Sequence, residues 1–261
     1  MNRIFNKFLF EAGWALYFGK VVSEGFVSHQ GTAVFYSTDG NFDIDFRHRF
    51  LDNAQLAVVP SLVKHNFIGK NFNHTVLLID PDNKLSILLN QQFKNNPDIA
   101  VSTLKKSFDE SFATFHTGFS EQAMSIFCQL KMFCGQTETE LIDARICKSV
   151  DYIKRNIENK IKIQELSKVA GLSESRLAHL FRQQIGMPIR KYVLWQRMKY
   201  SFFAAQNGFN LTEAALSGGF ADAAHFSRTV SALFGARQPK FCTTANLKIS
   251  RFIQAKTIQY M

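Results

Sequence analysis

The sequence predicts an α+β protein of two domains, with a strand-rich N-terminal domain and an all-helical C-terminal domain. Three observations lead to this prediction. Short apolar runs alternate with polar turns between residues 15 and 89, a helical segment that starts at residue 163 is echoed from residue 211, and positive charge is concentrated around both copies. At 261 residues, the chain is long enough to bury two hydrophobic cores.

The N-terminal region has the pattern of short strands joined by tight turns. Its apolar runs cover residues 32–36, 54–59 and 75–79, and polar turns such as Ser37-Thr38-Asp39-Gly40 and Asp80-Pro81-Asp82-Asn83 separate them. Runs of this length, rich in β-branched and aromatic residues, are typical of strands in a barrel or sandwich. We therefore expect a β domain here.

A helical segment is predicted between the two domains. Residues 120–133 place one apolar stripe at three- and four-residue spacing, with Ser120 as N-cap and an end near Gly135. Residues 101–115 show a less regular stripe. These helices could pack on the β domain of their own chain or on their copy in a second subunit, and the sequence does not decide between the two.

Two helix-turn-helix units are predicted from the repeated segment. Residues 163–173 are echoed by residues 211–220, and Gly171 and Gly219 occupy the turns, where glycine tolerates the positive φ that a sharp change of direction requires. A single glycine-turned pair would also suit an ordinary all-helical domain. Two tandem copies, about 48 residues apart, favour a DNA-binding pair. The apolar positions that follow the turns correspond in the two copies: Leu177, Leu180 and Phe181 in the first, and Phe226, Thr229 and Val230 in the second.

Capping residues place the helices of these units. Ser173 is the predicted N-cap of a helix that runs to about Gln184, and Asp222 caps the equivalent second helix. Asn210 and Glu213 have the spacing of a capping box. Pro188 begins a long connecting helix. Its predicted buried side consists of Tyr192, Trp195, Met198 and Phe202.

Charge separates the two halves of the chain. Residues 148–261 contain 18 Lys and Arg against 6 Asp and Glu, a net charge of +12, whereas residues 1–147 have 13 against 15, a net charge of −2. A basic surface attracts duplex DNA because each neutralised phosphate releases condensed counterions. A solvated basic face that only promotes solubility is the plainer alternative.

One dense motif resembles a known family. The run Gly219-Phe220-Ala221-Asp222-Ala223-Ala224-His225-Phe226-Ser227-Arg228, followed by Phe234-Gly235, is similar to the signature of the AraC/XylS family of bacterial transcription regulators. Residues 141–146 resemble the start of the same domain, and Arg197-Met198 lies at the position of the Arg and apolar pair in the connecting helix of that family. The family has proline three residues after the closing Phe-Gly, whereas this chain has Gln238 there and Pro239 next.

This resemblance implies a sequence-specific transcription regulator with a seven-helix DNA-binding domain. It further implies a homodimer, a small-molecule effector, and double-stranded DNA and RNA polymerase as partners. Periodicity and resemblance together place ten residues at or beside the base-reading positions. They are Glu174, Ser175, Arg176, Ala178, His179 and Arg182 in the first unit and Ala223, Ala224, Ser227 and Arg228 in the second.

The N-terminal pattern resembles a cupin-like double-stranded β-helix, the sensor domain common in that family. A metal-binding cupin has a second His two residues after the first and a carboxylate shortly beyond, but this chain has Gly31 at that distance from His29, and no acidic residue lies between His29 and Asp39. We therefore expect neither a metal nor another cofactor. We also expect no enzyme, because no nucleophile with a neighbouring base and no phosphate-binding glycine loop is present.

An effector pocket is predicted inside the β domain, with His29, Phe35 and His65 in its wall. Of the 27 Phe residues, 18 precede residue 148, and these aromatic rings either line such a pocket or form a bulky core. Two other classes of protein stay open. One is a regulator without an effector, whose β domain only dimerises, and the other is a cupin-type enzyme fused to a DNA-binding domain.

The expected division is a sensor domain over residues 1–96, a helical linker or dimerisation segment over 97–140 and a DNA-binding domain over 141–250. No run of about 18 apolar residues predicts a membrane helix, and the first residues lack the pattern of a secretory signal. We therefore expect a cytoplasmic protein. The spacing of its four cysteines, Cys128, Cys134, Cys147 and Cys242, predicts ordinary thiols rather than a disulfide framework.

Overall fold

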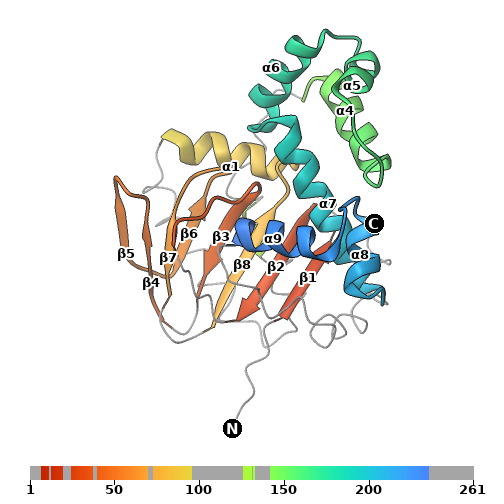
Figure 1. Ribbon diagram of the computed structural model, residues 1–261. Helices are drawn as coiled ribbons and strands as arrows, with labels where there is room; N and C mark the ends of the chain where they lie inside the picture. The colour runs from red at the N-terminus through yellow and green to blue at the C-terminus, as the bar shows by residue number, and fades with distance from the viewer. Residues whose placement is uncertain are drawn as a thin grey trace.

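The computed structural model describes residues 7–11, 13–19, 25–37, 40–69, 73–95, 126–130, 132 and 142–234. Figure 1 shows a β domain in the first part of this range and a group of helices in the second. The first three of these helices project from one end of the β domain, while the last one crosses in front of the larger sheet in this view (Figure 1). Within the described ranges, no helix has the length and hydropathy needed to cross a membrane.

The β domain consists of two antiparallel sheets. The larger has the order β1-β2-β8-β3-β6 and the smaller the order β5-β4-β7. The strands are β1 (Lys7–Glu11), β2 (Trp14–Gly19), β3 (Thr32–Tyr36), β4 (Phe42–Asp45), β5 (Phe50–Ala54), β6 (Leu56–Val59), β7 (Asn66–Ile68) and β8 (His74–Ile79). The predicted strands at 32–36 and 75–79 are confirmed.

Two details of the strand prediction were wrong. The predicted run 54–59 is divided at Gln55, because Ala54 pairs with β4 in the smaller sheet and Leu56 pairs with β3 in the larger one. The pattern of strands and turns also stops before residue 89, since helix α1 (Lys84–Asn95) begins directly after the Asp80–Asn83 turn. Leu85, Leu89 and Phe93 of α1 form a helical stripe that is buried against the sheet.

Both faces of the larger sheet are covered, which explains its nearly continuous apolar strands. Along β3, Ala33 and Phe35 belong to the cluster on one face, while Val34 and Tyr36 belong to the cluster on the other. The second cluster also contains α1 and the helical residues 126–130, where Ile126, Phe127 and Leu130 are buried. This part of the predicted stripe in 120–133 is confirmed; the rest of that stripe and the predicted helix 101–115 lie outside the described residues.

The C-terminal part forms the two predicted helix-turn-helix units. Six helices are described between residues 142 and 234, and residues after 234 lie outside the description. The first unit contains α4 (Ala144–Arg155), α5 (Ile163–Ala170) and α6 (Glu174–Ile185); α7 (Ile189–Gln206) connects it to the second, which contains α8 (Leu211–Ser217) and α9 (Ala223–Phe234).

The two units differ in how their apolar cores are built. The first has a separate core, which contains Leu166, Leu177 and Phe181. The second shares its core with the β domain, since Phe202 and Phe226 belong to the same cluster as Phe35 and other residues between the two sheets. The ring of Phe10 in β1 stacks on the ring of Phe202 in α7, with centroids 4.3 Å apart. Apolar packing therefore attaches the second unit to the β domain more extensively than the first.

Candidate nucleic-acid interface

Helix α6 is the second helix of the first unit, and its start is fixed by the turn before it. Gly171 has φ 62°, as predicted, and the next residue, Leu172, donates its backbone N–H to the carbonyl of Ser167 at 3.0 Å. The hydroxyl of Ser173 accepts a hydrogen bond from the backbone N–H of Arg176 at 3.3 Å, so Ser173 is the predicted N-cap. The chain thus turns sharply and presents α6 at a steep angle.

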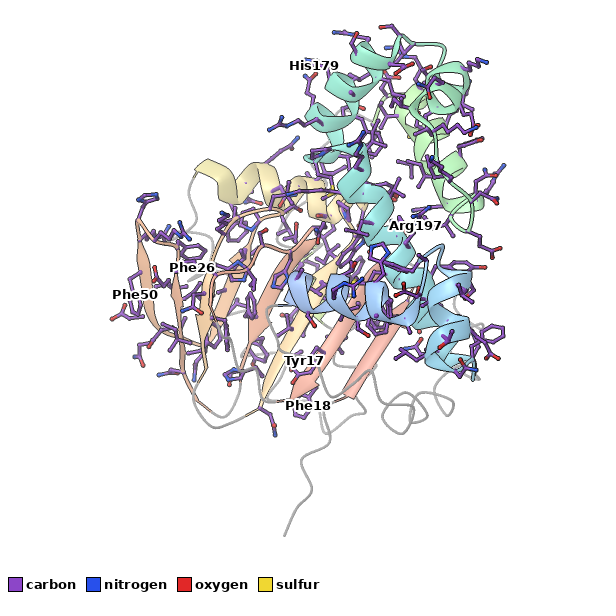
Figure 2. All side chains as sticks on the ribbon, viewed as in Figure 1. Tyr17, Phe18, Phe26, Phe50, His179 and Arg197 are labelled. Atoms are coloured by element: carbon purple, nitrogen blue, oxygen red, sulfur yellow. The ribbon has the colours of Figure 1, made fainter. Side chains whose placement is uncertain are left out.

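The outer face of α6 is free of protein contacts that would bury it. Leu177, Leu180 and Phe181 are 0%, 7% and 0% exposed, which confirms the predicted inner face. The six residues predicted to read or flank DNA bases are all exposed, and Figure 2 shows His179 on the projecting unit, away from the β domain. They are Glu174, Ser175, Arg176, Ala178, His179 and Arg182.

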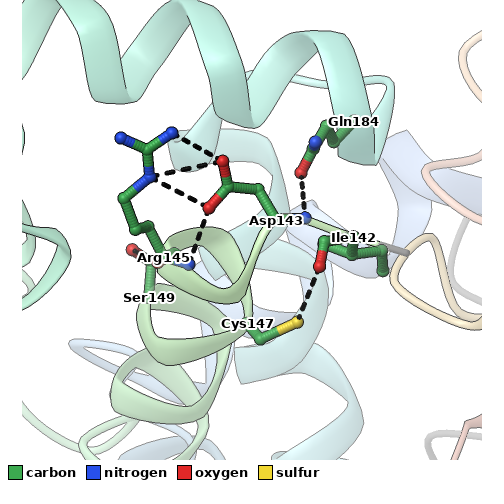
Figure 3. Close-up of polar contacts among 6 residues, drawn as sticks. All are labelled: Ile142, Asp143, Arg145, Cys147, Ser149 and Gln184. Atoms are coloured by element: carbon green, nitrogen blue, oxygen red, sulfur yellow. Dashed lines mark hydrogen bonds and ion pairs between the residues drawn. The ribbon is translucent and has the colours of Figure 1, made fainter. Parts of the chain in front are cut away.

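Polar contacts close the first unit where α4 begins (Figure 3). Asp143 is the N-cap of α4 and accepts hydrogen bonds from the backbone N–H and the guanidinium of Arg145. These hydrogen bonds hold the pKa of Asp143 at about 2. The backbone N–H of Asp143 donates to Oε1 of Gln184 at 2.9 Å, so the end of α6 is tied to the start of α4. Cys147 nearby is a free thiol, as is Cys128; the other two cysteines lie outside the described part.

The second unit has the predicted caps. Asn210 and Glu213 form a capping box at the start of α8, and Asp222 accepts a hydrogen bond from the backbone N–H of His225 at 2.6 Å. Gly219 in the turn has φ 76°, and a Cβ there would lie 2.7 Å from the carbonyl oxygen of Ile157. Only glycine fits this position, because both the backbone conformation and the space exclude a side chain.

Helix α9 offers a narrower free face than α6. Ala224 and Arg228 are exposed, whereas Ala223 and Ser227 are half-buried. Phe226 is buried and His225 packs its ring edge-on against Phe220, with centroids 5.2 Å apart, as expected for packing residues. Arg228 is therefore the one long hydrogen-bond donor among the four predicted reading positions of α9.

Helix α7 fixes the separation of the two units. Its predicted inner residues Tyr192, Trp195, Met198 and Phe202 are at most 1% exposed. Its 18 residues span about 27 Å at 1.5 Å per residue. This continuous helix therefore determines how far apart α6 and α9 lie.

Sequence reasoning missed a polar contact between α7 and the β domain. Lys199 is 4% exposed and its ammonium lies 2.5 Å from the carboxylate of Asp80, which follows β8. Trp195 Nε1 donates to the same carboxylate at 3.0 Å. The apolar pattern of α7 predicts which apolar residues are buried, but it does not predict that the polar residue Lys199 is buried as well. In the sequence, Asp80 is recognisable only as part of a turn.

The predicted effector-pocket residues lie together between the two sheets. The ring centroids of His29 and His65 are 5.0 Å apart, and those of Phe35 and His65 are 5.6 Å apart. His65 is fully buried, with Nδ1 3.0 Å from the carbonyl oxygen of Val63, and burial lowers its pKa. Among the residues that the structure describes, His65 Nε2 is a buried atom with no hydrogen-bond partner.

The structure gives a steric reason for the glycine at position 31. A Cβ at Gly31 would lie 2.3 Å from the carbonyl oxygen of Ile79, a contact that excludes every side chain at this place. The described part of the chain contains no group of three His, Cys, Asp or Glu residues that could hold a metal ion. His29 and His65 are thus brought together without a third ligand in this part.

Comparison with known proteins identifies the class of this chain. Residues 166–238 match the family model described as a helix-turn-helix domain. The chain is 24% identical over 191 residues to the probable transcriptional regulator LumQ of Photobacterium leiognathi, covering 69% of this chain and 75% of LumQ. It is 30% identical over 97 residues to the Msm operon regulatory protein of Streptococcus mutans, covering 35% of each. Residues 166–238 are therefore a helix-turn-helix domain, and the chain is similar to DNA-binding transcription regulators, as the motif predicted.

The arrangement of both domains has a solved counterpart. ToxT from Vibrio cholerae superposes with a TM-score of 0.53 at 13% identity, covering 88% of this chain and 96% of ToxT. A structure of wild-type ToxT with a bound unsaturated fatty acid gives the same TM-score at 16% identity, covering 90% of this chain and 95% of that one. The fold is therefore ToxT-like, with an N-terminal β domain and a C-terminal helix-turn-helix domain.

Proposed function

We propose that this regulator places α6 and α9 in successive major grooves on one face of the duplex and that α6 is the main reader. The observation that supports this division is the difference in exposure between the two helices. All six predicted positions of α6 are exposed, whereas Ala223 and Ser227 of α9 are half-buried. A hydrogen-bonding base contact is worth about 1–3 kcal/mol in discrimination, while alanine offers only apolar contact with a thymine methyl.

Binding to a library of operators with single base changes, at one fixed salt concentration, tests this proposal. The double variant His179→Ala/Arg182→Ala should lose base preference across one half of the binding site, and Arg228→Ala should affect only one or two positions in the other half. Gln183→Ala, an exposed change on the same helix, is the matched control. If Arg228→Ala loses preference at more positions than the double variant, α9 is the main reader instead.

The basic charge of residues 148–261 supports extensive contact with phosphates. The affinity of the full chain for its operator should fall by about 10³ or more between 50 and 200 mM salt if the protein makes about six or more phosphate contacts. An affinity that does not change with salt would exclude this mode of binding.

We infer that the β domain senses a small apolar molecule that carries a hydroxyl group or a protonated carboxyl group. The convergence of His29, Phe35 and His65 supports this inference, as does the buried His65 Nε2, which lacks a donor among the described residues. ToxT, which shares the fold, has been solved with an unsaturated fatty acid and with a naphthalenyl butenoic acid. Leaving a buried acceptor unpaired costs about 1–3 kcal/mol, and a donor on the ligand would remove that cost.

Titration calorimetry with oleate, an unsaturated fatty acid, tests this inference. The full-length protein should bind the fatty acid in its protonated form, because an apolar site raises the pKa of a carboxyl group. His65→Phe should weaken binding by about tenfold or more, since the carboxyl O–H of the ligand then lacks its acceptor. His48→Phe, at an exposed position, should leave the affinity unchanged. Equal binding by the wild type and by His65→Phe would show that His65 is not part of the site.

A regulator without an effector is the second candidate, and one observation favours it. Between the sheets, the ring centroids of Phe35, Phe42 and Phe67 lie 4.9–6.3 Å from one another, so aromatic side chains occupy much of this space. In that case the β domain serves for dimerisation alone. An operator affinity unchanged by oleate, together with no calorimetric signal, would support this candidate.

We further propose the finer architecture that the sequence predicts. The sensor covers residues 1–96 and closes as a cupin-like double-stranded β-helix, the linker covers 97–140, and the DNA-binding domain covers 141–250. The burial of one common cluster between the two sheets supports the closure. The protein acts as a homodimer and contacts RNA polymerase at its promoters. Sedimentation of the full chain and a pull-down of RNA polymerase on operator DNA test these two proposals.

A further inference from the structure

The turn between β8 and α1 contacts the first helix-turn-helix unit and the connecting helix α7. It consists of Asp80, Pro81, Asp82 and Asn83, and its two carboxylates extend to different helices. Asp80 contacts α7, which is packed with the second unit and the β domain, and Asp82 contacts α4, which belongs to the first unit. One four-residue turn therefore joins α4, in the core of the first unit, to the part of α7 that packs in the core of the second unit.

The contact of Asp80 with α7 is buried and has several hydrogen bonds. The side chains of Lys199 and Asp80 are 5% and 3% exposed, and Lys199 Nζ lies 2.5 Å from Asp80 Oδ2. The same ammonium donates to the backbone carbonyl of Glu11 at 3.1 Å, and Trp195 Nε1 donates to Asp80 Oδ1 at 3.0 Å. Lys199 and Trp195, one turn apart on α7, are thus held to the ends of β1 and β8.

The contact of Asp82 with α4 is more open. Lys154 Nζ lies 2.5 Å from Asp82 Oδ2, and the two side chains are 42% and 11% exposed. A cavity of about 180 Å³ lies between α4, α7 and the β domain, and both Lys154 and Lys199 line it. Apart from Leu62 of the β domain, which packs against the core of the first unit, a cavity remains in this space, so these polar contacts contribute to fixing the angle of that unit.

Buried ion pairs are poor sources of stability but can fix one arrangement among several. Desolvation offsets much of the attraction between Asp80 and Lys199, whereas a displaced partner would leave a buried charge unpaired. Such a pair therefore penalises any rotation of α7 relative to β8. Strand β8 also lies between β2 and β3 in the larger sheet, with Val76 and Leu78 facing the space between the sheets. A structural change between the two sheets would therefore be transmitted along β8 to the turn that follows it.

We propose that the Asp80–Asn83 turn is a clamp that sets the angle between the two helix-turn-helix units, and hence the spacing at which α6 and α9 meet the DNA. Asp80, Asp82 and Lys199 are positioning residues, which act on DNA binding through the helices they hold. This inference rests on the proposed function, in which both α6 and α9 enter the major groove. It adds the element through which the β domain controls that geometry.

The test measures how operator affinity depends on the spacing of the two half-sites. A duplex of about 30 base pairs is selected with the wild-type full chain from a random library, and one base pair is then inserted between the halves. The insertion rotates one half-site by about 35° and moves it by about 3.4 Å. The wild type should lose about tenfold or more in affinity, because its units keep a fixed angle.

Two variants release the clamp in different ways. Asp80→Leu/Lys199→Met removes the buried pair without leaving a lone charge, and Asp82→Asn weakens the exposed contact with α4. For each, the loss caused by the insertion should shrink to about threefold or less. Asp151→Asn, an exposed carboxylate on α4 with no ion pair described, is the control and should keep the wild-type penalty.

The outcomes separate the clamp from the proposed function. Near-UV circular dichroism first shows which variants keep the native fold. A folded double variant that retains the wild-type penalty would overturn the clamp, and if the double variant does not fold, Asp82→Asn decides in the same way. A wild type whose affinity ignores spacing altogether would overturn the reading of DNA by two helices, and the clamp with it. The variant His179→Ala/Arg182→Ala should lose base preference while it keeps the spacing penalty.

Discussion

Substitution of Phe181 by alanine should unfold the first helix-turn-helix unit selectively. Phe181 is 0% exposed in the separate core of that unit, and its ring packs edge-on against Tyr192, with centroids 5.4 Å apart. Removing a buried phenylalanine costs about 3–5 kcal/mol, and the lost aromatic pair favours the upper half of that range. We therefore expect the free energy of unfolding of this unit to fall by about 4–5 kcal/mol.

Hydrogen exchange of the full chain, read by mass spectrometry, localises the effect. Amides of α4, α5 and α6 should lose protection in Phe181→Ala, while those of β3 and β8 should keep theirs, because the two regions belong to different clusters. DNA binding should be lost as well. Gln183→Ala, an exposed change two residues away, is the control. Unchanged protection of α6 would refute the assigned inner face, and an equal loss in β3 would refute the separation of the cores.

Three further predictions concern pH and helix capping. Burial lowers the pKa of His65, so the contribution of its neutral ring to stability is complete above the ordinary pKa of 6.5 and is lost as pH falls below that value. The free energy of unfolding, measured by urea titration at several pH values, should therefore fall with decreasing pH by up to about 1.4 kcal/mol per pH unit more in the wild type than in His65→Phe. Hydrogen bonds from Arg145 lower the pKa of Asp143, so the stabilisation of α4 by this N-cap carboxylate should be complete above the ordinary pKa of 3.8 and disappear as pH falls through about 2. An NMR titration of the Asp143 carboxyl group should have its midpoint near 2 rather than near 3.8. Asn210→Ala removes the capping box of α8 and should lower stability by about 1 kcal/mol, whereas Asn207→Ala beyond the end of α7 should cost less; equal losses in thermal melts would contradict the cap assignment.

Local rules predicted the helix-turn-helix pair in detail. Ser173, Asn210 and Asp222 cap the helices as expected, and Gly171 and Gly219 have the positive φ that the turns demanded. These features depend on residues within four positions of one another, so a single sequence contains the needed information. The inner faces of α6 and α9 were equally readable, because helical periodicity alone determines them.

Features that depend on distant parts of the chain were not readable in the same way. Asp80 and Lys199 are 119 residues apart, and nothing local to either indicates the other. The sequence did not predict the division at Gln55, because one apolar run contributes a strand to each of the two sheets, and periodicity does not show that the neighbouring strand changes. The sequence also showed that Gly31 breaks the metal-ligand pattern, but the cause, contact with the carbonyl of Ile79, required the fold.

The shared core of the β domain and the second unit bears on how this regulator can be dissected. A fragment that starts at residue 142 would contain both units but would lack β1 and β8. Phe202 would lose the Phe10 ring, and Lys199 and Trp195 would lose the Asp80 carboxylate. Exposed aromatic surface of this kind promotes aggregation. Fragments intended to remain monomeric at high concentration therefore need a polar replacement at Trp195. The first unit has to be excised together with the start of α7, because Tyr192 belongs to its core.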